Sequence, residues 1–176
     1  MDAVEAIMTR RSVRKFTAQD VSESEVDVVL RAAMAAPSAS NERPWRFVVV
    51  RDRERLDRLS KSTPFAGALA SAPVGIVVAA DRAGLKYPGF WVIDCAAAIE
   101  NMLLAAHASG LGGVWIGVHP IRPFAWSVGR AVGLPRRVMP HSLVALGHPV
   151  SVPGPVDRFE DAWVHADEWA SRVTHA

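Results

Sequence analysis

The spacing of apolar residues predicts helices and strands that alternate along the chain. Val4, Ile7 and Met8 recur at helical spacing, and Ser22 with Glu25 forms a capping box before a second helical stretch. Short apolar runs bounded by glycine or proline predict buried strands. The expected helices cover residues 2–11, 22–36, 51–59, 64–72, 91–109 and 123–132, and the expected strands cover 47–50, 74–80, 114–118 and 142–146.

The stretch 91–109 is the longest apolar segment. Its apolar residues occur nearly all round the predicted helix, as expected of a helix at the centre of a core. Asp94, Glu100, Asn101 and His107 interrupt it, so a buried helix is expected rather than a membrane span. The order of elements predicts a layered α+β fold, with residues 1–176 forming a single domain.

Prolines and a glycine dominate residues 151–157, which predicts an extended C-terminal arm from about residue 150. The arm ends in an aromatic stretch, 163–169, that needs a surface on which to dock. Another subunit is one candidate, and the six tryptophans of the chain would suit a large intersubunit contact. Packing of the arm on its own protomer would explain the same residues, so both alternatives stay open.

Composition favours a globular protein, because half of the 176 residues are hydrophobic and 22% are charged. The net charge of +2 is too small to imply a nucleic-acid partner. Arginine far outnumbers lysine, which suits phosphate recognition, although the base composition of a genome produces the same bias. The N-terminus carries Asp2 and Glu5 and no apolar segment typical of a signal peptide. The single cysteine, Cys95, is expected in the core and fits a reducing cytoplasm.

A basic cluster ends the first predicted helix. Arg10, Arg11, Ser12 and Arg14 place four donors within five residues, enough to surround a phosphate. A solvated basic helix end would give the same composition, and it would be favourable near the negative pole of the helix.

A polar loop bracketed by Pro37 and Pro44 separates the second helix from the first strand. The residue before Pro37 is pushed out of the helical region, and Pro44 cannot donate to a sheet, so the strand should begin at or after Trp45. Between the prolines lie hydroxyl and amide side chains able to bind a flat polar ligand. An ordinary helix-to-strand connection also explains this composition.

Other chemistry finds little support in the sequence. The histidines lack the spacing of metal ligands, so no metal site is expected. No G-x-S-x-G elbow occurs, and the glycines at 110–113 follow a helix rather than a strand, unlike a dinucleotide-binding loop. No side chain is assigned a catalytic role.

Taken in order, these stretches resemble the FMN-binding nitroreductase family, in particular its short single-domain members. The resemblance spans nearly the whole chain. It is carried by RRS-x-R at 10–14, PS-x-x-N-x-x-PW at 37–45, a central helix at 90–106, GLG-x-x-W-x-G-x-x-P at 110–120, LG-x-P at 146–149, and D-R-F with V-H at 157–165.

The resemblance implies a three-layer α+β fold. Helices would flank a central mixed, mainly antiparallel sheet of four strands, with one further strand from the partner's C-terminal arm. It also implies a homodimer that holds flavin at its interface, which would give the arm its docking surface.

The resemblance further implies contacts to FMN, residue by residue. The phosphate and ribityl chain would be held by Arg10, Arg11, Ser12, Arg14 and Arg158. The ring would lie beside Trp115, Ile116 and Gly117. The other subunit would contribute Pro37, Ser38, Ala39 and Asn41.

The implied function is that of an FMN-dependent NAD(P)H oxidoreductase. It would reduce nitroaromatics, quinones or similar small molecules by ping-pong hydride transfer, with no nucleic-acid or membrane partner. A non-catalytic flavin-binding protein, or a dehalogenase or flavin-cleaving relative of the same fold, is the alternative. Two departures from the family pattern, His119 and Ala166, are expected to reshape the substrate pocket.

Overall fold

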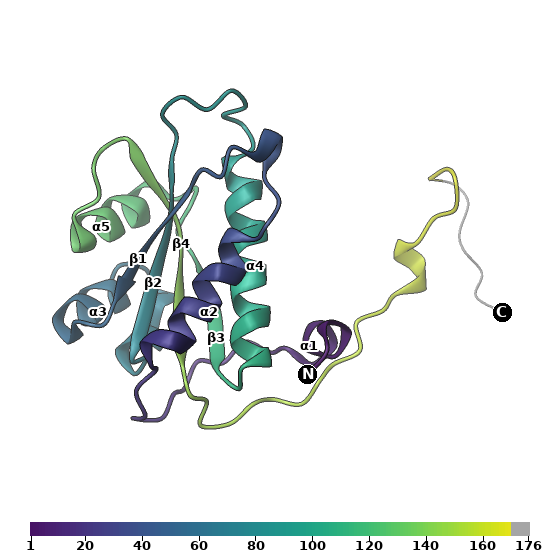
Figure 1. The fold of residues 1–176 in the computed structure, drawn as a ribbon, viewed down its shortest axis with the longest axis horizontal. Coiled ribbons are helices and arrows are strands. Elements are labelled where there is room, and N and C mark those ends of the chain that lie inside the picture. The colour runs from purple at the N-terminus through teal and green to yellow at the C-terminus, as the bar shows by residue number, and fades with distance from the viewer. Residues whose placement is uncertain (170–176) are drawn as a thin grey trace.

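A four-stranded sheet forms the centre of the protein (Figure 1), and the computed structural model describes residues 1–169. The strands β1 (Trp45–Val50), β2 (Val74–Asp81), β3 (Gly112–Gly117) and β4 (Val138–Gly147) lie in the order β1-β2-β4-β3. Each of these pairings is antiparallel. Among the described residues, parallel pairing is limited to an isolated bridge between Ser12 and Gly113. The predicted α+β, mainly antiparallel fold is confirmed.

Helices cover both faces of this sheet (Figure 1). The helices α2 (Glu23–Met34) and α4 (Trp91–Ala108) pack on one face, and α3 (Arg53–Ser60) and α5 (Arg122–Val132) pack on the other. The short helix α1 (Ala3–Thr9) contacts α4, while the 3₁₀ helices are η1 (Ala39–Asn41), η2 (Ala66–Ala70) and η3 (Asp161–Trp163). This arrangement gives the three predicted layers.

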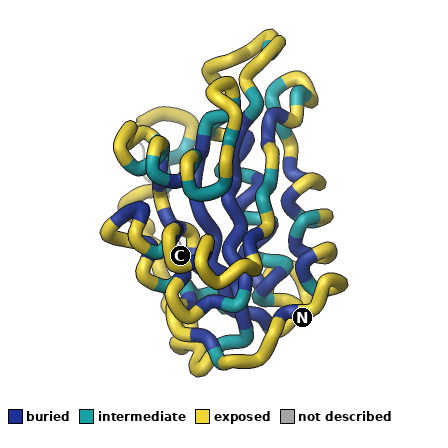
Figure 2. The backbone as a smooth tube through the Cα atoms, turned by 90° about the vertical axis from the view of Figure 1, so that its left-hand side faces the viewer, coloured by how far each residue is buried: buried dark blue, intermediate teal, exposed yellow. Residues whose placement is uncertain are grey.

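The continuous apolar run of β2 follows from its position in the sheet. It lies between β1 and β4, and residues 74–80 are all buried (Figure 2). Side chains alternate between the faces, so Ile76 and Val78 join the core under α2 and α4 while Val77 joins the core under α3 and α5. A strand covered on both faces has no need of alternating polar residues.

Local sequence signals fix several boundaries as predicted. The capping box is complete, because Glu25 N–H donates to Ser22 Oγ (3.3 Å) and Ser22 N–H donates to Glu25 Oε2 (2.7 Å). Strand β1 begins at Trp45, directly after Pro44. Gly133 ends α5 in the left-handed region at φ 69°, where a side chain would be strained.

Two elements differ from the sequence prediction. Residues 64–72 were expected to form an α-helix, but they hold a 3₁₀ helix of five residues, Ala66–Ala70. Gly67 weakens a helix here, and Pro73 pushes the residue before it out of the helical region. Strand β4 begins at Val138, four residues before the predicted Ser142. A register shift places Ser142 opposite Val78 and Pro140 opposite Ala79, so His141 forms a bulge beside a proline that cannot donate.

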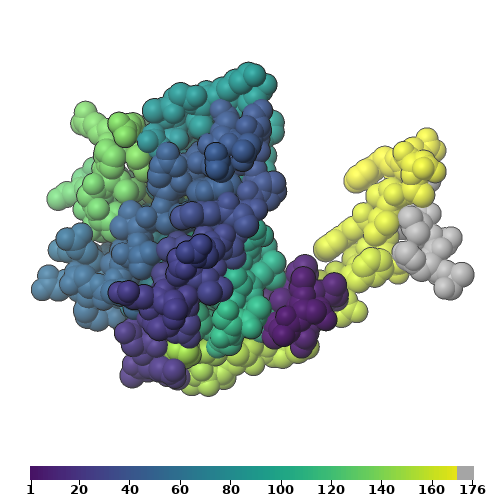
Figure 3. Space-filling model, in the orientation of Figure 1, coloured from purple at the N-terminus to yellow at the C-terminus, as the bar shows by residue number. Residues whose placement is uncertain are grey.

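The C-terminal arm leaves the sheet after β4 and extends away from the body of the protomer (Figure 3). It passes α1, whose Val4, Ile7 and Met8 are all exposed, and it carries the exposed Trp163. The end of the predicted arm, residues 170–176, lies outside the described residues. None of the helices in residues 1–169 is long and apolar enough to cross a membrane.

Candidate functional site

The basic cluster predicted from the sequence surrounds one cavity. The segment after α1 runs beside the start of β3, where Val13 N–H donates to the Gly113 carbonyl (3.0 Å). The arm returns to this segment. The cavity has a volume of about 260 Å³ and is lined by Arg10, Arg11, Ser12, Arg14, Pro153 and Arg158. The structure therefore brings together all five residues predicted to bind phosphate.

Positive charge dominates this cavity. Arg10 Nε forms an ion pair with Glu100 Oε1 on α4, at 3.1 Å. Among residues 1–169, no other arginine that lines the cavity has an ion pair. Arg11 donates to the backbone carbonyl of Gly154 in the arm. Four guanidinium groups against one carboxylate leave an excess of positive charge, and their planar donors suit a phosphate group.

An open backbone edge continues from the cavity along β3. The Gly113 carbonyl bonds to Val13 on the side away from β4, so the backbone groups of Trp115 and Gly117 point to that side as well. Gly117 is exposed, and a Cβ atom built on it would meet nothing within 4 Å. From Gly113 to Gly117 this edge measures about 13 Å at the usual strand rise.

The three residues predicted to lie beside the flavin ring differ in orientation. Trp115 is 37% exposed and Gly117 is also exposed. Ile116 is 2% exposed and packs into the core under α5. In the alternation of the strand, the backbone of Ile116 pairs with β4. The contact surface offered by this stretch therefore comes from Trp115 and Gly117.

The loop between α2 and β1 is held in an unusual conformation. Ser40, Asn41 and Arg43 have φ values of 49°, 57° and 49°, in the left-handed region. Such residues cost free energy and persist where surrounding contacts hold them. Ala39 N–H donates to Asp94 Oδ1 (3.0 Å), and Arg43 N–H donates to Ser38 Oγ (3.0 Å).

A second carboxylate anchors the same loop. Glu42 accepts from the backbone N–H groups of Lys86 and Tyr87, in the segment that precedes α4. The loop is therefore tied to the beginning of α4 by both Asp94 and Glu42. Its polar residues are presented in a fixed shape before any ligand binds.

Within one protomer, this loop and α1, which the basic cluster follows, lie apart (Figure 1). Ala39 binds Asp94 in the first turn of α4, whereas Thr9 Oγ1, beside Arg10, lies 2.8 Å from His107 Nε2 in the last turn. Thirteen residues of helix separate these contacts, or about 20 Å along the axis, while Arg10 itself reaches back to Glu100, six residues or about 9 Å beyond Asp94. The structure thus places Pro37, Ser38, Ala39 and Asn41 away from the basic cluster of the same chain.

Sequence reasoning missed a group of buried polar residues behind Trp115. Its indole Nε1–H donates to Ser142 Oγ (2.6 Å), and Ser142 Oγ lies 3.0 Å from His141 Nδ1. Burial lowers the pKa of His141 to about 4, and the positive charge that the nearby His119 can carry contributes to this lowering. The signal that could have found this group is strand pairing, because β3 and β4 pair Gly117 with Ser142.

His119, one of the two departures from the family pattern, lies next to this group. Its ring stands edge-on to Trp91, with the ring centroids 4.7 Å apart. Burial lowers the pKa of His119, and the positive charge of Arg82 lowers it further. The uncharged form is therefore favoured for both histidines.

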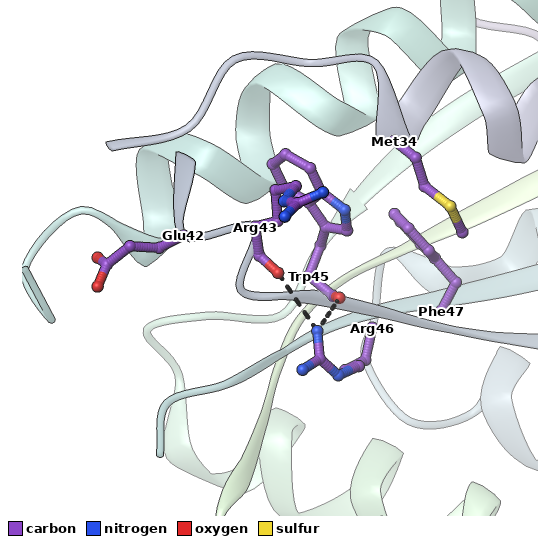
Figure 4. Close-up of a pocket in the computed structure, with 6 residues that line it drawn as sticks. All are labelled: Met34, Glu42, Arg43, Trp45, Arg46 and Phe47. Atoms are coloured by element: carbon purple, nitrogen blue, oxygen red, sulfur yellow. Dashed lines mark hydrogen bonds between the residues drawn. The ribbon is translucent and has the colours of Figure 1, made fainter. Parts of the chain in front are cut away.

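A separate hollow lies beside the start of β1 (Figure 4). It is lined by Met34, Glu42, Arg43, Trp45, Arg46 and Phe47, none of them predicted to bind flavin. The Arg46 guanidinium donates to the carbonyls of Trp45 (2.7 Å) and Arg43 (3.3 Å), as Figure 4 shows. These bonds satisfy the backbone where the loop enters the strand, which is a structural role.

The structure gives no sign of a reactive thiol or of a metal site among the described residues. Cys95 is buried in α4, and burial together with Asp94 raises the pKa of its thiol to about 12, which keeps it protonated. It is the core residue that was predicted. Residues 1–169 contain no group of three or more His, Cys, Asp or Glu side chains that could hold a metal ion.

Comparison with known proteins gives consistent matches along the chain. The model of the Nitroreductase family matches residues 7–63 and 59–148. A protein of Methanothermobacter thermautotrophicus, provisionally named an NADH dehydrogenase/NAD(P)H nitroreductase, is 45% identical over 169 residues, which cover 96% of this chain and 88% of that protein.

Solved structures share the fold. A provisionally assigned nitroreductase of Desulfovibrio desulfuricans in complex with FMN has a TM-score of 0.82 and 31% identity, covering 96% of this chain and 98% of that one. NADPH:FMN oxidoreductase from Vibrio harveyi, complexed with NAD⁺, has a TM-score of 0.84 and 28% identity, covering 95% and 77%. The family match over most of the sequence, the 45% identical relative and the shared fold lead to one conclusion: this chain belongs to the nitroreductase family.

Proposed function

We propose that this protein is an FMN-dependent NAD(P)H oxidoreductase that holds its flavin between two copies of the chain. The observation that carries the proposal is the cavity where Arg10, Arg11, Ser12, Arg14 and Arg158 meet. It opens beside the free edge of β3, so one protomer offers a phosphate site followed by a strip of exposed backbone. A phosphorylated ligand with a flat ring fits this sequence of groups.

In this proposal each part of the site has its own role. The arginines and Ser12 hold the phosphate and ribityl chain, while Trp115 and Gly117 lie along the ring and the buried Ile116 supports them from the core. Pro37, Ser38, Ala39 and Asn41 come from the partner protomer. The arrangement along α4 supports this division, because Ala39 of the loop contacts Asp94 in the first turn of that helix, whereas Arg10 of the cavity contacts Glu100 further along it.

The surface of the protomer supports a homodimer. Helix α1 buries Ala6 but exposes Val4, Ile7 and Met8, an unfavourable arrangement for a helix that faces water alone. The arm beside it extends from the body with Val152 and Trp163 exposed. A partner protomer would cover these side chains and would offer the arm a sheet edge for the predicted additional strand.

The chemistry would come from the cofactor, since flavins accept and donate hydride equivalents. The chain itself would bind, orient and exclude water. NAD(P)H and an acceptor such as a nitroaromatic or quinone would occupy the same place in turn, which predicts ping-pong kinetics. No side chain is assigned to proton transfer, and a cytoplasmic location stays an expectation drawn from the single cysteine.

A spectrum of the purified protein tests the proposal. We expect flavin absorbance, or its appearance after FMN is added, and bleaching with NADH or NADPH in the absence of oxygen. Steady oxidation of NAD(P)H with a nitroaromatic or quinone should then give parallel lines in double-reciprocal plots. Protein that binds no FMN at micromolar concentration would refute the proposal.

The same experiment separates the alternatives. Flavin that is bound and reduced without turnover on any acceptor would favour a non-catalytic flavin-binding protein. Bound flavin that NAD(P)H fails to reduce would favour a specialised relative of the same fold, such as a dehalogenase or flavin-cleaving enzyme.

A further inference from the structure

Three side chains connect the exposed face of β3 to the buried interior. Trp115 is 37% exposed on β3, whereas Ser142 and His141 on β4 are 1% and 5% exposed. The indole Nε1–H of Trp115 donates to Ser142 Oγ at 2.6 Å, and Ser142 Oγ lies 3.0 Å from His141 Nδ1. A partly exposed aromatic ring is thus hydrogen-bonded to a buried polar pair.

The direction of the first hydrogen bond is fixed by its donor. An indole N–H can only donate, so Ser142 Oγ accepts from Trp115. The hydroxyl keeps one proton and a second lone pair, so it donates to Nδ1 of His141 or accepts from it according to the tautomer of the ring. In both cases Ser142 links the indole to the buried imidazole. The imidazole also interacts with the backbone of Val92.

The surroundings of His141 keep it in place and uncharged. The ring stands edge-on to Trp91, with centroids 5.8 Å apart, and the backbone carbonyl accepts from Val118 and His119 N–H. Burial favours the neutral ring, in agreement with the lowered pKa.

His141 contacts the beginning of α4, which also holds the polar loop of the candidate site. Val92 belongs to the first turn of α4, as does Asp94, which holds Ala39 of the polar loop. The same helical turn therefore anchors the orientation of Trp115 on one side and the shape of the loop on the other.

We propose that Ser142 and His141 are positioning residues, which fix the indole of Trp115 beside the open edge of β3 and so shape the place where a flavin ring and a planar aromatic acceptor lie. The inference rests on the proposed function and names two residues that act through Trp115. Without the bond to Ser142, the ring would be free to turn about its side-chain torsions, because Trp115 is 37% exposed.

The test compares two variants of nearly equal shape, Ser142→Thr and Ser142→Val, which differ in the hydroxyl. The first readout uses protein without flavin: the indole N–H signal of Trp115 in ¹H–¹⁵N NMR spectra, assigned with Trp115→Phe. We expect a signal protected from hydrogen exchange in the wild type and in Ser142→Thr. In Ser142→Val it should be shifted and should exchange at least tenfold faster.

The second readout concerns the ligand. With the hydroxyl removed, we expect FMN binding to weaken by roughly two- to tenfold relative to Ser142→Thr, the usual effect of one lost hydrogen bond. The KM for a nitroaromatic acceptor should rise more than kcat falls. Melting temperature and far-UV circular dichroism check that both variants fold.

The outcomes separate this inference from the proposed function. Identical Trp115 signals in the Thr and Val variants would overturn it, and so would equal FMN affinities of the two. If the signals differ but even the wild type takes up no FMN, the hydrogen-bond chain stands as structure, while the positioning role and the proposed function both fail.

Discussion

At the scale of single residues, charge is the property that sets the candidate site apart. The cavity gathers Arg10, Arg11, Arg14 and Arg158 from two ends of the chain, and one of them is paired with a carboxylate. Holding four cations together costs electrostatic free energy unless an anion balances them. This arrangement is typical of a phosphate site.

Replacing Arg14 by glutamine should therefore weaken FMN binding by about tenfold, because charge-assisted hydrogen bonds to phosphate are among the strongest in proteins. Affinity for riboflavin, which lacks the phosphate, should stay unchanged. Both affinities can be measured by quenching of flavin fluorescence. Lys15→Gln is the matched control, since Lys15 is the next residue, is exposed and does not line the cavity. Equal losses for both flavins would contradict the assignment.

The buried His141 predicts a pH dependence of stability. Its pKa of about 4 in the folded protein lies below 6.5, so the unfolded chain binds a proton more readily. Its stabilising contribution is complete above pH 6.5 and is lost as the pH falls from 6.5 to 4, by about 3 kcal/mol. His119 acts with the same sign.

Urea unfolding at several pH values measures this effect. In His141→Gln we expect lower stability at pH 7.5, because the hydrogen-bond chain is disturbed, but a smaller further loss between pH 6.5 and 4. A variant that loses as much stability over this range as the wild type would show that another group is responsible.

At the scale of elements, the surroundings of β3 differ between its two ends. Near Gly112 it is covered, and a Cβ there would lie 2.8 Å from the Cβ of Val13. At Gly117 it is open, with nothing within 4 Å of a Cβ. The covered end holds the basic segment in place, and the open end leaves backbone groups available to a ligand.

The glycines of β3 provide a matched pair of substitutions. Gly112→Ala should lower the free energy of unfolding by about 1–3 kcal/mol, because the added methyl overlaps a β-branched side chain. Gly117→Ala should leave the stability of the flavin-free protein within about 0.5 kcal/mol. It should nevertheless weaken FMN binding severalfold, because the added methyl would project on the same face of β3 as Trp115, beside the proposed place of the ring. Unchanged FMN affinity in Gly117→Ala would place the ring elsewhere.

The polar loop depends on α4 for its shape. Asp94→Ala leaves the N–H of Ala39 without its partner, so we expect a loss of about 1–3 kcal/mol in stability and faster hydrogen exchange of that amide. FMN affinity should fall too, since the loop would relax from its left-handed conformations. Asp27→Ala serves as the control, because Asp27 forms an exposed pair with Arg31 on α2. A loop amide that stays protected would refute this role of Asp94.

At the scale of the whole molecule, the proposed site draws on two protomers. The loop contacts the first turn of α4, whereas α1 lies near its other end and presents apolar side chains to solvent (Figure 1). A second copy of the chain would resolve both features. Cofactor binding and association should therefore be linked, each strengthening the other.

Ile7→Glu tests this linkage. Ile7 is 59% exposed on α1, and a carboxylate there should prevent association while leaving the fold of the protomer intact. We expect a monomer in sedimentation experiments, together with at least tenfold weaker FMN binding. Ile121→Glu, an exposed isoleucine before α5 on the other side of the sheet, should remain a dimer that binds FMN. A wild-type protein that sediments as a monomer while holding FMN would contradict the proposal.

The sequence by itself determined the order of elements, the capping box of α2, the start of β1 after Pro44, and the family. These depend on local propensities, on the spacing of apolar residues and on motifs in register, all of which act through neighbours in the chain. It also predicted Arg158 as a partner of Arg10–Arg14, although by resemblance and not by spacing.

Only the tertiary structure decided the contacts between strands, and between the loop and α4, that join residues far apart in the chain. The bulge at His141, the bond from Trp115 to Ser142 and the burial of Ile116 depend on the register of β4 against β2 and β3. The anchoring of Ala39 by Asp94 depends on the packing of α4. These contacts join residues that are 27 to 64 positions apart, as with Trp115 and Ser142 or Val78 and Ser142. No local pattern encodes such contacts, because their free energy is gained only when the complete sheet has formed.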